Sequence, residues 1–215
     1  MLKTKWLVIL VLAAVTVAMC PAGVQAAFLG QLTTARVLER GVQDISGFVG
    51  FFEHATLFLG QARRGLSSGI DGGLQFGLID PEGGDVGLEI GGDLKFALID
   101  AHPGDPFDLA VHARTAFFNY EKVSVFQLGG SLVMSHSYPL SSGSSLEPYG
   151  AVNLRLERIS VDSDNSAKDV DYDDTSLEIG AVGGLKWDVS DLIDILGEFV
   201  LDDDIGFIFG VNFKI

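Results

Sequence analysis

The sequence IGFIFGVNFKI occupies residues 205–215, at the end of the chain. Every second residue from Ile205 to Ile215 is apolar or aromatic, whereas the residues between them are mostly small or polar. A period of two residues is typical of a β-strand whose two faces meet different surroundings. We expect the wholly apolar face to be covered, and a closed barrel in lipid covers both this face and the edges of the strand.

The composition is acidic and apolar at the same time. The 215 residues carry a formal net charge of -15 and have a positive mean hydropathy, which is unusual for a soluble domain of this size. We expect no nucleic-acid partner, because phosphate binding requires an excess of Lys and Arg. Glycine is abundant with 27 residues and proline is scarce with 6, as expected where strands pack closely rather than where linkers run free.

Residues 1–26 have the layout of a cleaved secretory signal peptide. Two lysines near the start precede the apolar run 6–19, and residues 24–26 (VQA) supply a small-residue cleavage site. The apolar run is short for a transmembrane anchor and is followed by helix-breaking residues. We therefore expect the mature chain to begin at Ala27. Its formal charge is then -17, because cleavage removes two lysines and no acid from a chain of charge -15.

The single cysteine, Cys20, lies within this signal. A lipoprotein signal is the alternative interpretation, but Met19 stands where a small residue is needed just before a lipidated cysteine. Without Cys20 the mature chain has no disulfide, no thiolate nucleophile and no cysteine-based metal site. An exported, acidic, cysteine-free chain rich in glycine and alternating strands indicates a Gram-negative cell envelope.

The mature chain divides into a lead-in segment and a series of strands. Residues 27–41 are the least regular part, and we expect them to lie in the mouth of a barrel or to extend into the periplasm. Alternating segments separated by turns then fill residues 42–215. The predicted strands cover 42–52, 55–61, 70–78, 86–98, 107–117, 125–135, 146–159, 175–187, 193–201 and 205–215. Most are near the roughly 9 to 11 residues that a tilted strand needs to cross a bilayer. The sequence predicts a closed antiparallel transmembrane β-barrel of about ten strands, with eight or twelve as alternatives.

The connections between strands predict an orientation. With the amino terminus in the periplasm, four turns face that compartment, at 63–68, 101–106, 138–145 and 189–191. The longest polar break, the acidic run 160–174, then lies outside the cell. Short periplasmic turns and longer external loops are typical of bacterial outer-membrane barrels.

Alternation alone leaves a soluble barrel of the lipocalin kind as the rival, with the apolar face turned inward. Lipid is favoured by the length of the strands, the abrupt end of the last strand and the small residues on the polar face. These small residues, which suit a crowded lumen, include Gly73, Gly77, Gly87, Gly91, Ala110 and Ala116. Aromatic residues gather near strand ends as candidates for an interfacial girdle: Phe107, Phe117, Trp187, Phe207 and Phe213.

With its signal peptide, regular strand code and terminal strand, the chain resembles the small, porin-like outer-membrane β-barrel proteins of Gram-negative bacteria. Phe209, Val211 and Phe213 are similar to the terminal signal that the barrel assembly machinery recognises, and Ile215 stands where many family members have Phe. The resemblance implies an outer-membrane location after export through the periplasm. It also implies a monomer in contact with outer-membrane lipid, lipopolysaccharide and the assembly machinery. It implies no reaction.

The polar face supplies the candidate site, which would line the lumen. These residues are Glu89, Asp93, Lys95, His112, Arg114, Asn153, Arg155, Glu157, Glu178, Lys186 and Glu198. In a narrow lumen opposite charges have to pair, since unpaired burial is costly. One interpretation is a structural network that plugs the barrel. The other is a narrow polar conduit for small solutes, with Arg114 and Arg155 opposing Glu89, Asp93 and Glu198.

Two further functions are weaker alternatives. A lipid-modifying barrel enzyme would need His112 or His136, but Ser135 and Ser137 flank His136 and would point to the opposite face of a strand. We expect no catalytic residues and no cofactor. The acidic loop 160–174 could instead act in surface adhesion.

The same loop is a weak candidate for Ca²⁺, through Asp169, Asp171, Asp173 and Asp174. Its spacing lacks the Gly and the terminal Glu of an EF-hand, which favours a solvated loop. The sequence thus predicts an integral outer-membrane barrel with a structural or narrow-channel role.

Overall fold

The computed structural model describes residues 30–81, 84–100, 106–120, 122–141, 143–161, 172–202 and 205–215. The predicted signal peptide and the predicted start of the mature chain lie outside these ranges, as does most of the predicted acidic loop, 162–171. Within the described ranges, no helix is long and apolar enough to cross a membrane.

The described residues contain eleven strands. They are β1 (Gln43–Phe52), β2 (Ala55–Ser67), β3 (Ile70–Pro81), β4 (Gly87–Ile99), β5 (Asp108–Tyr120), β6 (Val123–Ser135), β7 (Tyr138–Pro139), β8 (Ser145–Val161), β9 (Tyr172–Asp188), β10 (Ile193–Leu201) and β11 (Ile205–Lys214). The two-residue β7 pairs with the start of β8, and the other ten strands form the wall.

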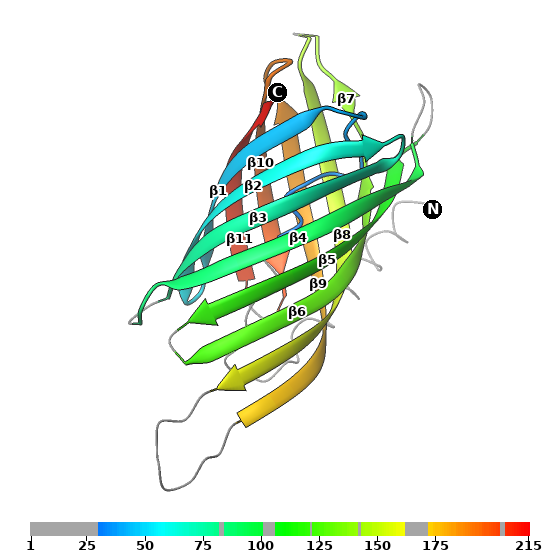
Figure 1. Ribbon diagram of the computed structural model, residues 1–215. Helices are drawn as coiled ribbons and strands as arrows, with labels where there is room; N and C mark the ends of the chain where they lie inside the picture. Colours follow the sequence, from blue (N-terminus) through cyan, green and yellow to red (C-terminus); the bar gives the residue numbers. More distant parts are fainter. Residues whose placement is uncertain are drawn as a thin grey trace, which may run out of the picture.

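The wall is closed, and every pairing between its strands is antiparallel. Each wall strand pairs with the next along the chain, with β6 joined directly to β8, for example at Leu128↔Leu156. The first and last strands complete the ring, with Phe48 opposite Gly210. The prediction of a closed antiparallel barrel of ten strands is confirmed (Figure 1).

The two ends of the barrel differ. At one end the start of β1 lies beside the end of β11, and the backbone N–H of Ile215 donates to the carbonyl of Gln43 at 2.8 Å. We call this the terminal end and the opposite one the loop end. At the loop end β8 and β9, with 17 residues each, extend beyond the other strands (Figure 1).

Three predicted turns need correction. The turn at 63–68 is wrong, because β2 continues to Ser67 and the chain reverses around Gly69, whose φ of 82° suits a tight turn. The break at 160–174 is too long, because Ser160 pairs with Asp173 and the hairpin continues to Val161. The turn 138–145 contains β7. In each case backbone pairing extends through polar residues that resemble a turn in the sequence.

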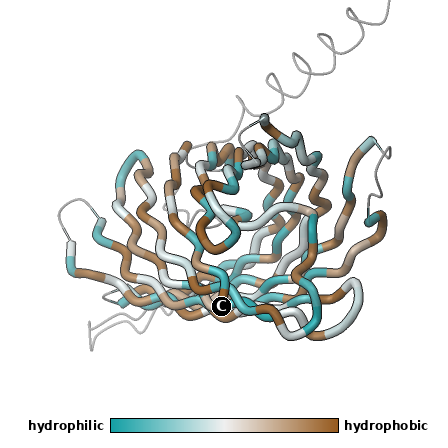
Figure 2. The backbone as a smooth tube through the Cα atoms, turned by 90° about the horizontal axis from the view of Figure 1, so that it is seen from above, coloured by the Kyte–Doolittle hydropathy of each residue, from teal (hydrophilic) through white to brown (hydrophobic). Residues whose placement is uncertain are grey.

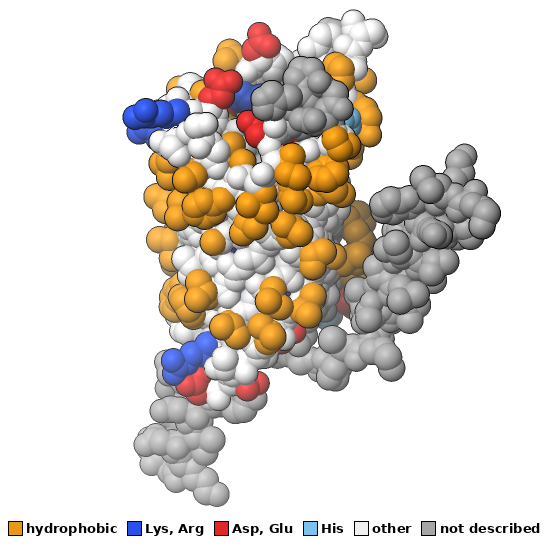
Figure 3. All heavy atoms as spheres, turned by 90° about the vertical axis from the view of Figure 1, so that its right-hand side faces the viewer, with side chains coloured by type: hydrophobic (Ala, Val, Ile, Leu, Met, Phe, Trp, Pro, Cys, Tyr) orange, Lys and Arg blue, Asp and Glu red, His pale blue; other side chains and the backbone are white. Residues whose placement is uncertain are grey.

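The outer surface of the wall is apolar. On β11 the side chains of Phe207, Phe209 and Phe213 are 50%, 56% and 50% exposed, whereas the inward Ile208 is 0% exposed. The hydropathy colours alternate along the strands in Figure 2. Figure 3 shows hydrophobic side chains over the middle of the wall, with charged ones at both ends. Since lipid solvates such a surface and water does not, this is the lipid-facing belt of a transmembrane barrel.

The lumen is more apolar towards the loop end than the predicted polar face suggests. Phe48, Leu57, Leu59, Val200 and Ile208 all point inward and are buried there. Gly210 makes room for this layer, since a Cβ at that position would overlap the Phe48 ring. We call these five side chains the apolar layer. They fill the lumen by packing rather than by hydrogen bonding.

Candidate functional site in the barrel lumen

The structure places the predicted lumen-lining residues on the inner face of the wall. Nine are buried at 9% exposure or less, namely Glu89, Asp93, Lys95, His112, Arg114, Asn153, Arg155, Glu157 and Glu198. The other two, Glu178 and Lys186, are half-buried on the same face of β9. Burial of this many charged groups requires partners inside the barrel.

The main partner is a segment of the chain itself. Residues 30–40, which we call the luminal segment, run inside the barrel, and Gln31, Leu32, Thr34 and Ala35 are buried (Figure 1). Side chains from β3, β4, β5, β6 and β10 contact this segment. Residues 30–40 of the predicted lead-in segment 27–41 therefore occupy the lumen, and residues 27–29 lie outside the described ranges.

Lys95 binds the middle of the luminal segment. Its ammonium donates to the Thr33 hydroxyl at 2.8 Å, to the carbonyl of Thr34 at 3.0 Å and to the carbonyl of Arg36 at 2.6 Å. It also lies 3.2 Å from an Asp71 carboxylate oxygen. All three donor positions of the ammonium are thus used on the segment, which fixes its backbone against β4.

Glu198 binds the deepest part of the segment. Its carboxylate accepts from the backbone N–H of Gln31 at 2.8 Å, from the N–H of Leu32 and from the Tyr149 hydroxyl at 2.5 Å. Positive φ values at Gly30 (68°) and Leu32 (57°) turn the consecutive N–H groups towards one point. Such a backbone turn is a common anion-binding arrangement. Here the anion is supplied by the opposite wall of the same barrel.

Gln31 inserts its side chain between β5 and β6. Its amide nitrogen lies 2.6 Å from His112 Nδ1, and its amide oxygen accepts from the Ser131 hydroxyl at 2.8 Å. In this orientation the amide donates, so His112 Nδ1 accepts and the Nε2–H donates to Asp93 at 2.6 Å. Both ring nitrogens of His112 are therefore occupied by structural hydrogen bonds.

Ion pairs complete the lumen in three groups. Near the terminal end Arg63 pairs with Asp71 and Asp93. On β8 Arg155 pairs with Asp202 and with Glu157.

In the third group, Lys186 lies 3.3 Å from Glu147 and 3.2 Å from Asp188, and Lys214 lies 2.9 Å from Asp194. The predicted opposition of Arg114 and Arg155 to Glu89, Asp93 and Glu198 is found for Arg114 only. Arg114 does oppose the predicted carboxylates, since it interacts electrostatically with Asp93, Glu89 and Glu198, and it also donates to the carbonyl of Gly30. Arg155 instead forms ion pairs with Asp202 and Glu157.

The sequence prediction did not include several residues of the site. Arg63 was placed in a turn, and Asp71, Ser131, Ser135 and Glu147 were not among the predicted lumen residues. The alternation of side chains along a strand could have identified them. Each of these residues lies an even number of positions from another inward-pointing residue on its strand, and therefore points to the same face. Gln31 carried no such signal, since the segment that contains it has no period.

The predicted assembly signal lies on the outer face of β11, with Phe209, Phe213 and Ile215 exposed and Val211 partly so. Of the weak Ca²⁺ candidates, Asp169 and Asp171 lie outside the described residues. Asp173 pairs with Arg158 at 2.5 Å, and the carboxylate of Asp174 accepts from the Thr175 N–H. In the described part of the chain, no group of three or more His, Cys, Asp or Glu side chains is arranged to hold a metal ion.

No family model and no curated protein matches the sequence. The chain is similar to several solved structures at low identity. The N-terminal β-barrel domain of Pseudomonas aeruginosa OprF is 13% identical, with 83% of this chain and 100% of that chain covered and a TM-score of 0.40. The KdgM porin is 8% identical, with 79% and 98% covered and a TM-score of 0.41. The translocator domain of autotransporter NalP from Neisseria meningitidis is 12% identical, with 82% and 89% covered and a TM-score of 0.46. Similarity at this level assigns no function. A proposal for the function therefore has to rest on the geometry of the lumen.

Proposed function

We propose that this chain is an integral outer-membrane barrel of a Gram-negative bacterium whose lumen is closed by its own luminal segment, which gives the protein a structural role in the membrane. The observation that carries this proposal is the set of hydrogen bonds from the wall to residues 30–40. Lys95 and Glu198 alone contribute five of them. We expect a segment that is fixed from several sides to block a continuous polar path through the lumen.

The location rests on the wall and on the start of the sequence. In a closed barrel every strand pairs with two neighbours, so the backbone N–H and C=O groups are hydrogen-bonded within the protein. This pairing is necessary in a bilayer, because the hydrocarbon core offers no water to these groups. The signal-like residues 1–26 supply export, and the aromatic end of β11 supplies the assembly signal. Lipid and lipopolysaccharide are then the expected surroundings, and the barrel assembly machinery is the expected partner during biogenesis.

A narrow conduit for small polar solutes is the second candidate. It is favoured by one observation: the wall contacts the luminal segment mainly through polar side chains, which water can solvate if the segment withdraws. The apolar layer opposes conduction, since a hydrophobic constriction excludes water and ions. Conduction would therefore require both the segment and this layer to move.

The test is single-channel recording of refolded mature protein, beginning at Ala27, in planar bilayers. We expect the native protein to be silent, and Lys95→Met to produce brief openings, because it removes three hydrogen bonds to the segment. Lys122→Met is the matched control, since Lys122 is exposed beyond β5 at the loop end. It should be silent.

Removing residues 27–40 separates the two candidate roles. Silence after this deletion, in a barrel that still shows heat-modifiable mobility, supports a structural role sealed by the apolar layer. Steady conductance that appears only in the deletion variant supports the conduit. Steady conductance of the native protein would refute the closed lumen itself.

A further inference from the structure

The barrel wall has an open strand edge at the loop end. β9 pairs with β8 along its length, as far as Tyr172↔Val161. On its other side β9 pairs with β10 only as far as Ala181↔Leu201. Residues 173–179, which we call the β9 edge, therefore have no strand partner on that side in the described part of the chain. At roughly 3.3 Å per residue, this edge is roughly 23 Å long.

The β9 edge presents backbone hydrogen-bonding groups to its open side. The N–H of Val189 donates to the carbonyl of Ile193 at 3.0 Å, so Val189 directs its backbone groups to the β10 side. Alternate residues of a strand face the same neighbour, and the register of β9 runs without a shift to its first residue. The residues that face the open side are therefore Asp173, Thr175, Leu177 and Ile179. The N–H of Thr175 donates to the carboxylate of its own neighbour Asp174 at 2.9 Å, in place of a strand carbonyl.

The β9 edge lies past the loop end of β10 (Figure 1). β10 has nine residues, close to the roughly 9 to 11 that a tilted strand needs to cross a bilayer. Unpaired backbone groups do not face hydrocarbon, since the bilayer core offers them no hydrogen-bond partner. The edge therefore belongs in the aqueous phase at the mouth of the barrel.

Two apolar side chains of the β9 edge are more exposed than the residues opposite them. Leu177 is 60% exposed and Ile179 is 70% exposed, whereas their partners on β8, Leu156 and Leu154, are each 50% exposed. At these positions β8 has a neighbour on both sides and β9 has a neighbour on one side. A strand added to the edge would cover the open flank of both side chains.

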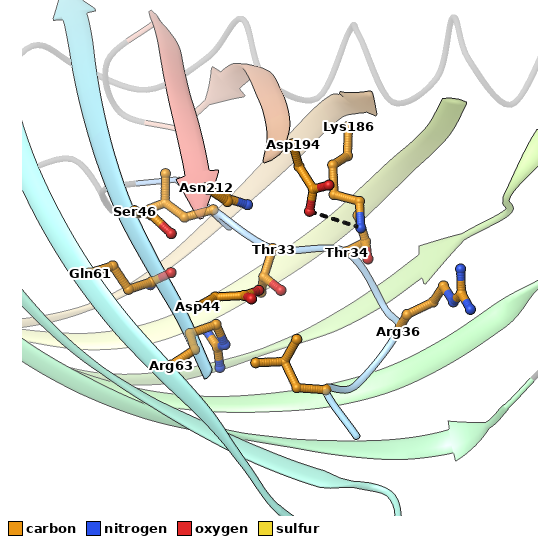
Figure 4. Close-up of a pocket in the computed structure, with 12 residues that line it drawn as sticks. Thr33, Thr34, Arg36, Asp44, Ser46, Gln61, Arg63, Lys186, Asp194 and Asn212 are labelled. Atoms are coloured by element: carbon orange, nitrogen blue, oxygen red, sulfur yellow. Dashed lines mark ion pairs between the residues drawn. The ribbon is translucent and has the colours of Figure 1, made fainter. Parts of the chain in front are cut away.

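The charges at the two ends of the barrel differ. Near the terminal end, side chains of both signs meet in the lumen, and Lys186 lies 3.8 Å from Asp194 (Figure 4). The stretch 172–180 of β9 contains three acids and no Lys or Arg. Of these acids, Asp173 points outward and pairs with the exposed Arg158 of β8.

The other two acids, Asp174 and Glu178, lie on the opposite face of β9. Arg155 is directly opposite Glu178 in register, but its ion pairs are with Glu157 and Asp202. The carboxylates of Glu157 and Glu178 are close enough to repel each other. Among the described residues, none forms an ion pair with Glu178. A cation that approaches from the open side would therefore meet a favourable field.

Strand addition to an exposed sheet edge uses main-chain hydrogen bonds for affinity and alternate side chains for specificity. We propose that the β9 edge binds an extended segment of a partner protein as an additional strand. Its apolar side chains lie beside Leu177 and Ile179, and its basic side chains, on the other face, lie beside Asp174 and Glu178. A second copy of this chain is a poorer occupant, because its own edge brings the same carboxylates and like charges on paired strands repel.

The probe is a dye-labelled peptide of four valine–lysine repeats, and the measurement is its fluorescence anisotropy with the mature protein refolded in detergent. We expect saturable binding. The matched control peptide has the same side chains and charges but methylated backbone nitrogens, which block strand pairing. It should bind at least about tenfold more weakly, since it loses several main-chain hydrogen bonds. A peptide with glutamate in place of lysine should not bind.

Thr175→Pro tests the edge from the side of the protein. Proline removes the N–H that faces the open side, and a proline at such a position is compatible with an edge strand. Thr175→Ala is the matched variant, because it also loses the hydroxyl but keeps the N–H. With heat-modifiable mobility as the test of folding, Thr175→Pro should bind about tenfold more weakly and Thr175→Ala like the native protein. Glu178→Gln should weaken binding of the basic peptide as well.

Three results would overturn the proposal. An absence of binding to the native protein would mean that the acids protect the edge from pairing. Equal binding of the two lysine peptides, or equal binding by the two Thr175 variants, would reduce the interaction to attraction by an acidic surface. A dimer of the native protein that is lost in Thr175→Pro would make a second copy the occupant. None of these results depends on whether the lumen conducts.

Discussion

The carboxylate of Glu198 on β10 accepts a 2.8 Å hydrogen bond from the backbone N–H of Gln31, 167 residues earlier in the chain. This contact joins the most irregular part of the sequence to one of its most regular strands. Gln31 and Leu32 both donate to Glu198, so these two contacts of the luminal segment require β10 in the wall.

Glu198→Ala should release the deep end of the luminal segment. The change leaves the Gln31 and Leu32 N–H groups and the Tyr149 hydroxyl without their acceptor, at about 1–3 kcal/mol for each buried group left unpaired. Hydrogen exchange followed by mass spectrometry should show faster exchange over residues 30–40, with the wall strands unchanged. Glu198→Gln keeps one acceptor oxygen and should have a smaller effect. Equal protection in the native and Ala proteins would show that Glu198 does not hold the segment.

Gly30→Ala should displace the segment by steric overlap. Gly30 has φ of 68°, and an added Cβ would meet the Glu198 carboxylate and Ile208. Gly41→Ala is a matched control, because Gly41 has φ of 91° but nothing within 4 Å of an added Cβ. Both changes carry the strain of an L-residue at positive φ, of about 1 kcal/mol or more, and only the first adds a clash. Proteolysis of the luminal segment in folded protein should therefore increase more for Gly30→Ala. A ranking in the opposite order would contradict the close approach to Glu198.

Arg63→Ala should destabilise the barrel strongly. Arg63 pairs with Asp71 and Asp93 at a buried site, and removing one partner of a buried pair typically costs about 3–5 kcal/mol. Arg158→Ala is the control, since its pair with Asp173 is exposed and exposed pairs contribute little to stability. The measurement is the urea midpoint of unfolding in lipid vesicles. Combining Arg63→Ala with Asp93→Asn should recover part of the loss, because it removes a carboxylate left unpaired. Equal midpoints for the two arginine variants would place Arg63 outside the lumen network.

Leu154→Arg should test which face meets lipid. Leu154 is 50% exposed on the outer face of β8, between the two ends of the belt. An arginine at the midplane of a bilayer costs a transmembrane barrel about 2–4 kcal/mol, falling to about 0–1 near the interfaces. Leu192→Arg is the control, because Leu192 is 63% exposed at the terminal end between β9 and β10. Unfolding in vesicles should distinguish the two variants. If both are tolerated alike, the apolar belt does not face hydrocarbon.

The candidate site was only partly accessible to sequence reasoning. Inward positions such as Lys95, Arg114 and Asn153 follow from parity along each strand, because successive side chains point to opposite faces. Arg63 was missed, since it begins the polar run Arg63-Arg64-Gly65 and turns favour such residues. The burial of its guanidinium between Asp71 and Asp93 overrides that local preference. The inward apolar layer was missed because Phe48 and Leu57 belong to strands whose two faces are both partly apolar.

The sequence by itself determined the strands, their approximate number and the face that each side chain occupies. These properties are local, because each strand segment by itself shows the two-residue alternation of apolar and polar side chains. The tertiary structure decided which inward groups meet and what occupies the lumen. Arg63 reaches Asp93 across 30 residues, and Gln31 reaches Glu198 across 167. Such contacts depend on the stagger and closure of the whole barrel, which no single segment encodes.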